Sequence, residues 1–313
     1  MKITNALPQG YLLHQYRIAR TLGGGGFSIV YLAHDTRASQ PVVIKEYLPG
    51  KQATRRDGES VESLSAETAT TFNTGMKRFF DEANALSKVQ HPNIVRVIDF
   101  FRENNTVYMV MNYEEGKDLR WYIKRHHGRM SEKFIRTVFP QLLAGLRELH
   151  NNHLLHLDIK PANVYLRPGG SPLLLDFGAA QSAFIGERHV GPHTLTRGFA
   201  PIEQHTRGHI GPWTDLYAVG ATMWACMCGK APPPANKRAE RDRYKPAVRQ
   251  FAGRYSRQLL EAVDWCLQMD QMFRPQKVDD LLDFLNKEPG ATPAPQPESL
   301  MARWSLKLPW NRK

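Results

Sequence analysis

One stretch in the middle of the chain limits what the chain can fold into and what it can do. Asp158, Lys160 and Asn163 place a carboxylate, an amine and a carboxamide within six positions, and a second carboxylate, Asp176, follows after a short predicted hairpin. Phosphoryl transfer needs this set: an Asp that orients and deprotonates an attacking hydroxyl, a Lys that offsets charge on the moving group, and an Asn and an Asp that hold magnesium. Either motif alone is commonplace in a loop, but the two in this order favour phosphotransfer chemistry over chance.

The complete motifs resemble the catalytic loop and the metal-binding turn of protein kinases. They read His156-Leu157-Asp158-Ile159-Lys160-Pro161-Ala162-Asn163 and Asp176-Phe177-Gly178. The Lys two residues after Asp158 is similar to the Ser/Thr branch, since tyrosine kinases usually lack it. The resemblance implies that Asp158 and Lys160 are catalytic and that Asn163 and Asp176 bind the metal.

A glycine run joins two predicted strands near the N-terminus. Residues 14–48 have the alternation of three strands, and glycines between them let the backbone approach a phosphate. The run resembles the phosphate loop of kinases, but Ser28 stands where that family has its third Gly, so we expect a looser fit over the terminal phosphate. The ATP-binding residues that this resemblance implies are Leu22, Gly23, Gly24, Gly25, Gly26, Phe27, Ser28 and Val30.

The next predicted strand, Val42-Val43-Ile44-Lys45, resembles the kinase strand that carries a phosphate-binding Lys. Apolar spacing over residues 79–89 predicts a helix. It is followed by His91-Pro92-Asn93-Ile94-Val95, which is similar to the loop after the kinase regulatory helix. The resemblance implies that Val43 and Lys45 bind ATP and that Glu82 pairs with Lys45. The alternative is a solvated Lys and an exposed helical Glu.

Residues 50–75 form an insert that is longer than a typical connection. The preceding Lys45-Glu46-Tyr47-Leu48-Pro49 resembles bacterial eukaryotic-like Ser/Thr kinases. We expect a mobile, solvated loop, and favour that over a regulatory phosphosite on one of its hydroxyls. Those hydroxyls include Thr68, Thr70, Thr71 and Thr74.

A predicted hairpin over residues 94–101 and 107–111 leads into a segment that resembles the hinge between the kinase lobes. Its backbone would read the adenine edge. Asp118 would meet the ribose hydroxyls, although a helix N-cap accounts for it equally well. The remaining ATP-binding residues implied by the resemblance are Met111, Asn112, Tyr113, Glu114, Asp118 and Tyr165.

Two features beside the catalytic motif depart from simple expectations. A long helix is predicted over residues 131–152, and Pro140 inside it should kink it or free a carbonyl. Leu157 stands where many kinases have an Arg that binds a phosphate on the activation segment. Because Leu cannot make charge-assisted hydrogen bonds, we predict that activity does not depend on a phosphate docked there.

Residues 179–197 are the activation segment by resemblance. Thr196 occupies the position that contacts the catalytic Asp and Lys in Ser/Thr kinases. Asp215 would accept hydrogen bonds from the catalytic-loop backbone, and Arg274 would pair with Glu203. The activation-segment and structural residues implied in this way are Thr194, Thr196, Glu203, Asp215 and Arg274.

The C-terminal third contains a Pro-rich and then basic stretch, residues 231–245, which we predict to be a loop. Two or three further helices should follow, up to residue 286. Residues 287–313 are interpreted as a Pro-rich linker and a short basic and aromatic tail. Four apolar residues make a weak membrane anchor, so docking of this tail on protein is favoured over a membrane surface.

The composition is that of an ordinary globular protein, with 42% hydrophobic and 23% charged residues among 313. The basic residues behind the net charge of +12 are scattered, with modest clusters at residues 124–129 and 237–245 and no aromatic-interleaved basic stripe, so no nucleic-acid partner is expected. The three cysteines are interpreted as reduced core thiols of a cytoplasmic protein. No signal peptide or membrane span is expected.

Together these features predict a protein-kinase-like α+β bilobal fold over residues 14–286. The lobes would be a small antiparallel-sheet lobe with one regulatory helix, about 14–111, and a mainly helical lobe, about 115–286. The expected activity is transfer of the γ-phosphoryl of ATP to Ser or Thr of proteins, with Mg²⁺ or Mn²⁺, and autophosphorylation. A nucleotide-binding pseudokinase scaffold and a small-molecule phosphotransferase are the alternatives. A cognate protein phosphatase is a candidate partner, and the oligomeric state is left open.

Overall fold

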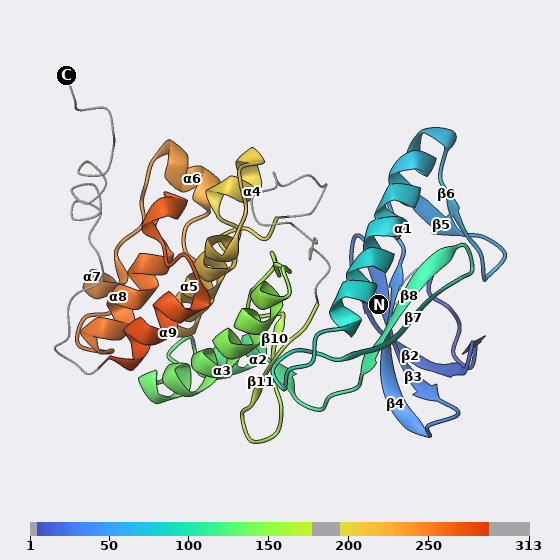
Figure 1. Ribbon diagram of the computed structural model, residues 1–313, viewed down its shortest axis with the longest axis horizontal. Coiled ribbons are helices and arrows are strands. Elements are labelled where there is room, and N and C mark those ends of the chain that lie inside the picture. The colour runs from blue at the N-terminus through green and yellow to red at the C-terminus, as the bar shows by residue number, and fades with distance from the viewer. Residues whose placement is uncertain (1–4, 177–194, 288–313) are drawn as a thin grey trace. The chain divides into compact units, whose positions relative to one another are not determined.

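The computed structural model describes residues 5–176 and 195–287, and it divides into two compact units, Met1–Glu115 and Gly116–Lys313. Each unit is considered by itself (Figure 1). Within the described residues, no helix is both long and apolar enough to cross a membrane. The predicted activation segment up to Thr194 and the predicted tail from residue 288 lie outside the described residues.

The first unit is built on an antiparallel sheet with strand order β1-β2-β3-β4-β8-β7. The three strands predicted before residue 48 are confirmed, and so is the later hairpin. The β7–β8 turn contains Asn104 and Asn105, both with positive φ, which Asn tolerates better than most residues. The strands are β1 (Leu12–Leu13), β2 (Tyr16–Gly24), β3 (Ser28–Asp35), β4 (Gln40–Tyr47), β7 (Val97–Glu103) and β8 (Thr106–Asn112).

The expectation of a mobile loop at residues 50–75 was wrong. This stretch holds a hairpin, β5 (Ala53–Arg55) and β6 (Val61–Ser63), followed by the first turns of α1 (Ala66–Ser87). Helix α1 therefore starts well before residue 79, because Ser65 and Thr68 form a reciprocal capping box. Phe72, on an early turn of α1, stacks on Tyr47 with ring centroids 5.7 Å apart. The insert is thus folded: the capping box starts its helix, and the contact of Phe72 with Tyr47 packs that helix on the sheet.

A buried carboxylate ties the insert hairpin to the sheet. Glu46, fully buried on β4, accepts hydrogen bonds from the hydroxyls of Tyr31 and Tyr108, each at 2.6 Å. Arg55 of β5 adds an ion pair to the same carboxylate at 2.5 Å. Burial, and after it the charge of Glu46, raises the pKa of both phenols, so they remain donors at neutral pH. The carboxylate is fully satisfied, as a buried charge must be.

The second unit is mainly helical, around the buried helix α5. Helix α3 is capped by Ser131, the first residue of the helix predicted over 131–152, and it continues through Pro140. Residues 231–245 contain a short helix, so the prediction of a loop there was wrong; Pro234 precedes that helix and leaves its first turn intact. The helices are α2 (Leu119–Arg125), α3 (Glu132–Asn151), α4 (Ile202–Thr206), α5 (Pro212–Cys228), α6 (Ala235–Glu240), α7 (Ala247–Gln250), α8 (Arg257–Cys266) and α9 (Val278–Asn286).

A small three-stranded sheet in the second unit includes the hairpin that directly follows the predicted catalytic loop, residues 156–163. Strands β9 (Lys117–Asp118), β10 (Val164–Leu166) and β11 (Pro172–Leu174) pair antiparallel in the order β11-β10-β9. The β10–β11 hairpin is the one predicted between Asn163 and Asp176.

Of the cysteines, Cys226 and Cys266 are buried free thiols, as expected, and burial raises the pKa of both.

Candidate active site

Asp215 on α5 holds the backbone of the predicted catalytic loop. Its carboxylate, fully buried, accepts hydrogen bonds from the backbone N–H of Leu157 (2.7 Å) and of His156 (2.9 Å), as the sequence predicted. The ring of His150 contacts the same carboxylate at 2.9 Å. Leu157 has φ of +61°, a left-handed conformation that costs a non-Gly residue free energy. The two charge-assisted bonds therefore hold a strained turn directly before Asp158.

Asp158, Lys160 and Thr196 form a closed triangle of hydrogen bonds. The Lys160 ammonium donates to Asp158 Oδ2 at 2.6 Å and to Thr196 Oγ1 at 3.0 Å. The Thr196 hydroxyl donates to Asp158 Oδ1 at 2.8 Å. Both contacts predicted for Thr196 are thus present. The carboxylate and the amine converge on one point, and both side chains remain partly exposed to solvent.

Asn163 faces the same carboxylate. Its side-chain N–H donates to the carbonyl oxygen of Asp158 at 2.9 Å and to Oδ2 at 3.1 Å. Because the amide nitrogen is used in this way, the amide oxygen is turned away as an acceptor. The Leu175 N–H donates to the Asn163 carbonyl at 2.9 Å. The β10–β11 hairpin therefore brings Leu175 back beside Asn163, and Asp176 is the next residue. Asp176 itself has φ of +58°.

The donor types of Asn163 and Asp176 fit magnesium. Mg²⁺ takes hard oxygen ligands and is usually held by one or two carboxylates together with substrate phosphates, rather than by an all-protein cage. In residues 5–176 and 195–287, no three His, Cys, Asp or Glu side chains gather as a metal-binding group. An amide oxygen plus a carboxylate is therefore a donor set that such an ion could complete with phosphate and water.

His156 links the catalytic loop to the end of β11. Its Nε2 lies 3.1 Å from the carbonyl oxygen of Leu175, and its Nδ1 accepts from the Asp158 N–H at 3.3 Å. A carbonyl can only accept, so Nε2 carries the proton and the ring is the neutral tautomer. Complete burial lowers the pKa of His156 and outweighs the nearby carboxylates, which agrees with that assignment.

The side chain of Leu157 is packed in the apolar interior of the second unit. Its side chain belongs to a buried apolar cluster with Leu155 and Ile210. Its carbonyl oxygen accepts a hydrogen bond from the side-chain amide of Gln204, on α4, at 3.0 Å. Sequence reasoning missed Gln204 and His150, because each stands among polar neighbours in the sequence and no local pattern sets it apart.

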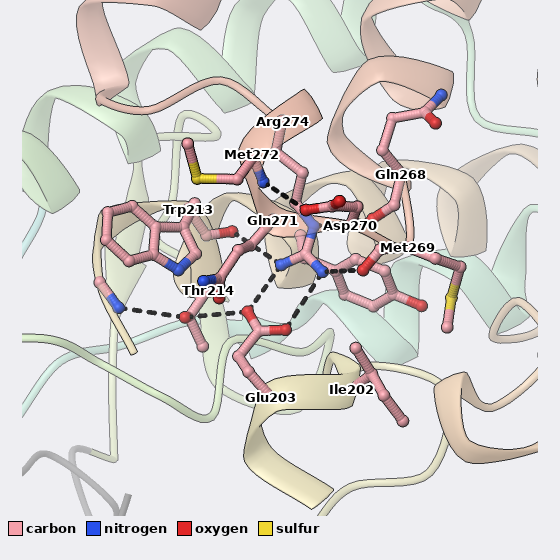
Figure 2. A network of polar contacts seen from close by, with 12 residues as sticks. Ile202, Glu203, Trp213, Thr214, Gln268, Met269, Asp270, Gln271, Met272 and Arg274 are labelled. Atoms are coloured by element: carbon pink, nitrogen blue, oxygen red, sulfur yellow. Dashed lines mark hydrogen bonds and ion pairs between the residues drawn. The ribbon is translucent and has the colours of Figure 1, made fainter. Parts of the chain in front are cut away.

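The predicted pair of Glu203 and Arg274 is present and buried (Figure 2). Two parallel hydrogen bonds of 2.6 and 3.1 Å join the guanidinium to the carboxylate. The Thr214 hydroxyl donates to the same carboxylate at 3.0 Å. The guanidinium also donates to the carbonyls of Gln268 and Met269, so its donors are satisfied. This bond anchors α4, and with it the segment after Thr196, to the helical unit.

In the first unit, the glycine run forms the turn between β2 and β3. Gly23 pairs with Val30, and the Gly25 N–H donates to the Ser28 carbonyl at 2.9 Å. A side chain added at Gly23, Gly25 or Gly26 would meet nothing within 4 Å, so open space lies beside this turn. The geometry leaves the backbone accessible to a ligand, as a phosphate loop requires.

Lys45 lies on β4 opposite Val30 of β3. It is 5% exposed, with its ammonium 5.8 Å from the centroid of the Phe79 ring. Glu82 is buried on the same helix as Phe79, three residues later, which places both on one face of α1. The ion pair between Lys45 and Glu82 stays a prediction.

Of the other predicted ATP-binding residues, those from Met111 to Glu114 end the first unit, and Asp118 and Tyr165 lie on β9 and β10 of the second. Met111 and Asn112 end β8, and Tyr113 and Glu114 follow. Asp118 is the N-cap of α2 and accepts from the Trp121 N–H at 3.0 Å. The N-cap reading of Asp118 is thus confirmed, while its contact with ribose stays a prediction. The Tyr165 hydroxyl donates to the Gly116 carbonyl at 2.7 Å.

Comparison with known proteins supplies an independent finding. A family model described as protein kinase domain matches residues 16–284. Serine/threonine-protein kinase PrkC of Bacillus subtilis is 30% identical over 219 residues, which is 70% of this chain and 31% of that protein. Serine/threonine-protein kinase pkn2 of Myxococcus xanthus is 28% identical over 290 residues, 87% of this chain and 32% of that protein.

A solved structure called PpkA-294 apo form is similar in fold, with a TM-score of 0.80 and 33% identity. The similarity covers 90% of this chain and 100% of that one. The chain spans about a third of the length of PrkC and pkn2.

Proposed function

The chain belongs to the protein kinase family, within which bacterial Ser/Thr kinases are among its relatives, and we propose that it transfers the γ-phosphoryl of ATP to Ser or Thr hydroxyls of proteins. The observation that carries this proposal is the triangle of Asp158, Lys160 and Thr196. It brings a proton acceptor and a cation to one point and fixes both through a hydroxyl of the segment that leads into α4.

Asp158 is the group that acts on the acceptor hydroxyl. Its carboxylate is oriented by three hydrogen bonds. Lys160 and the Asn163 amide donate to Oδ2 and Thr196 donates to Oδ1, so Oδ1 keeps one lone pair for a further donor. That carboxylate would orient the hydroxyl of the substrate and take its proton. Most of the acceleration should come from this positioning and from electrostatics, because phosphoryl transition states are loose.

Lys160 stabilises charge on the phosphoryl group in transit. Its ammonium is 2.6 Å from the Asp158 carboxylate, which holds it in place beside the reacting centre. Lys45, buried on β4, would bind the α- and β-phosphates, with Glu82 as its orienting partner. The glycine turn and the residues from Met111 to Glu114 would supply backbone groups for the phosphates and the adenine edge.

Asn163 and Asp176 would hold Mg²⁺, or Mn²⁺ in its place. The ion supplies charge neutralisation at the β- and γ-phosphate oxygens when it is bound. The amide orientation of Asn163, set by its two bonds to Asp158, leaves its oxygen for that role.

The wider assignments are also proposals. The kinase domain would be residues 14–286, followed by a linker and tail at 287–313. The protein would work in the cytoplasm on protein substrates, and a cognate protein phosphatase would reverse its products.

A test compares acceptors directly. Degenerate peptides with Ser, Thr or Tyr as the only hydroxyl, together with a sugar and an aminoglycoside, are incubated with labelled ATP and Mg²⁺. The proposal predicts label on Ser and Thr peptides only. Label on the small molecules alone would make it a small-molecule phosphotransferase, and nucleotide binding without any label would make it a pseudokinase.

A further inference from the structure

Half of the net charge of the chain is concentrated in one span of the second unit. Residues 195–255 contain ten Lys and Arg against four Asp and Glu, a net charge of +6 out of +12. Scattered charge would place far less in a span of this length. The span begins at Leu195 and runs through α4, α5, α6 and α7.

All four acids in this span are already engaged. Glu203 is held by Arg274, and Asp215 by the catalytic-loop backbone and His150. Glu240 pairs with Lys237 and Asp242 with Arg238. None of these carboxylates is therefore available to neutralise the remaining cations of the span.

The cations that remain are exposed. Seven side chains of the span are exposed and form no hydrogen bond or ion pair with any part of the chain that the structure describes. We call them the basic face. They are Arg197, Arg207, Lys230, Arg241, Arg243, Lys245 and Arg249.

Two parts of the basic face, Arg197 and the residues around α6, lie next to the segment that contacts Asp158 and Lys160. Thr196, which touches Asp158 and Lys160, directly precedes Arg197. Gly198, with φ of +86°, packs so closely on Ala231 and Pro232 that an added Cβ would lie 2.7 Å from both. Helix α4 contacts α6, and Figure 1 shows the two helices side by side. These contacts place residues 231–240 alongside the segment that fixes Asp158, whereas α7, which carries Arg249, packs on α8.

From this arrangement we propose that the basic face selects protein substrates in which Asp, Glu or phosphorylated residues flank the acceptor Ser or Thr. The inference rests on the proposed kinase function and adds the substrate class. Each exposed ion pair contributes little, but several like charges around one site attract an anionic segment together. The effect should appear in the KM for peptide and in its dependence on salt, with little change in kcat.

The experiment measures kcat and KM for three Ser peptides of equal length, with acidic, neutral or basic residues around the acceptor. The proposal predicts that the acidic peptide has a KM roughly tenfold or more below that of the basic one. It also predicts that the difference shrinks between about 50 and about 300 mM salt, because screening weakens exposed charges.

A matched pair of variants assigns the effect to the basic face. Arg241→Gln, Arg243→Gln and Lys245→Gln together remove three of its charges. Lys124→Gln, Arg125→Gln and Lys133→Gln remove three exposed charges from α2 and α3 of the same unit. The first triple variant should raise the KM of the acidic peptide roughly fivefold to tenfold. The second should leave it unchanged, and both should keep the kcat of the neutral peptide.

Other results would overturn the inference in recognisable ways. Equal KM values for the three peptides, or equal effects of the two triple variants, would contradict the substrate class while leaving the kinase function intact. The surface would be assigned to nucleic acid if the protein bound labelled single-stranded RNA and the first triple variant lost that binding without a change in peptide KM. No phosphorylation of any peptide would instead count against the kinase function itself.

Discussion

The side-chain amide of Gln204 donates a hydrogen bond of 3.0 Å to the carbonyl oxygen of Leu157. Both residues are buried. Leu157 thus has its N–H held by Asp215 and its carbonyl held by Gln204, on either side of a left-handed turn. Because Asp158 follows directly, these two bonds set the direction in which its carboxylate, the proposed catalytic group, leaves the backbone.

Replacement of Gln204 by Leu should therefore lower kcat more than it changes the KM for ATP. The buried Leu157 carbonyl would lose its partner, at a cost of about 1–3 kcal/mol. Small displacements of a catalytic group reduce turnover strongly, so we expect a roughly tenfold or larger loss in kcat. Gln141→Leu is the control, since its amide bonds only a carbonyl of its own helix. Equal loss of kcat in both variants would argue against a positioning role.

Activity should not require a phosphate on the activation segment. Leu157 is packed with Leu155 and Ile210 and offers no cation to a phosphate. Enzyme stripped by a protein phosphatase, with complete removal checked by mass spectrometry, should keep the turnover of the untreated enzyme. Abolished turnover after this treatment would show that a phosphate is bound elsewhere.

The pair of Glu203 and Arg274 should be worth far more to stability than an exposed pair. Arg274→Met would leave a buried carboxylate with only the Thr214 hydroxyl, and we expect a loss of about 3–5 kcal/mol in the free energy of unfolding. Arg147→Met breaks an exposed pair with Asp279 and should cost at most about 1 kcal/mol. Denaturant unfolding of both variants measures the difference, and similar losses would contradict this reading of the anchor.

Stability should fall as the pH drops below about 6.5, the ordinary pKa of His. Burial lowers the pKa of His156 in the folded protein, so below that pH the unfolded chain binds a proton that the folded protein does not bind. The free energy of unfolding should decline in that window by up to about 1.4 kcal/mol per pH unit for each His whose pKa is lowered in this way. His156→Gln should flatten the slope, while His205, whose pKa burial also lowers, still contributes. An unchanged slope in the variant would contradict a neutral His156.

The parts of the site that could be predicted from sequence are those set by short spacing. The distances between Asp158, Lys160 and Asn163 along the chain fix which side chains meet. The contacts of Thr196, Asp215 and Arg274 were expected only from the resemblance to protein kinases. The pairing strands before residue 48 were predictable because alternation reports burial directly.

The insert and α6 were not predictable in the same way. The ion pair of Arg55 with Glu46 joins two strands through a buried network that no local pattern reveals. The start of α1 depended on a Ser65 and Thr68 cap inside a polar stretch that reads as loop. Gln204 donates a hydrogen bond to the backbone of a residue 47 positions away, and a hydrogen bond at that separation produces no periodic pattern in the sequence.

The central claim is that Asp158 and Asp176 serve one phosphotransfer site, and nucleotide-dependent labelling tests it most directly. Wild type, Asp158→Asn and Asp176→Ala are incubated with labelled ATP and Mg²⁺, with mapping of acid-stable sites, while nucleotide binding is followed separately. We predict label on Ser or Thr for wild type and its loss in both variants, with nucleotide still bound by Asp158→Asn. Undiminished label in Asp158→Asn would contradict the account.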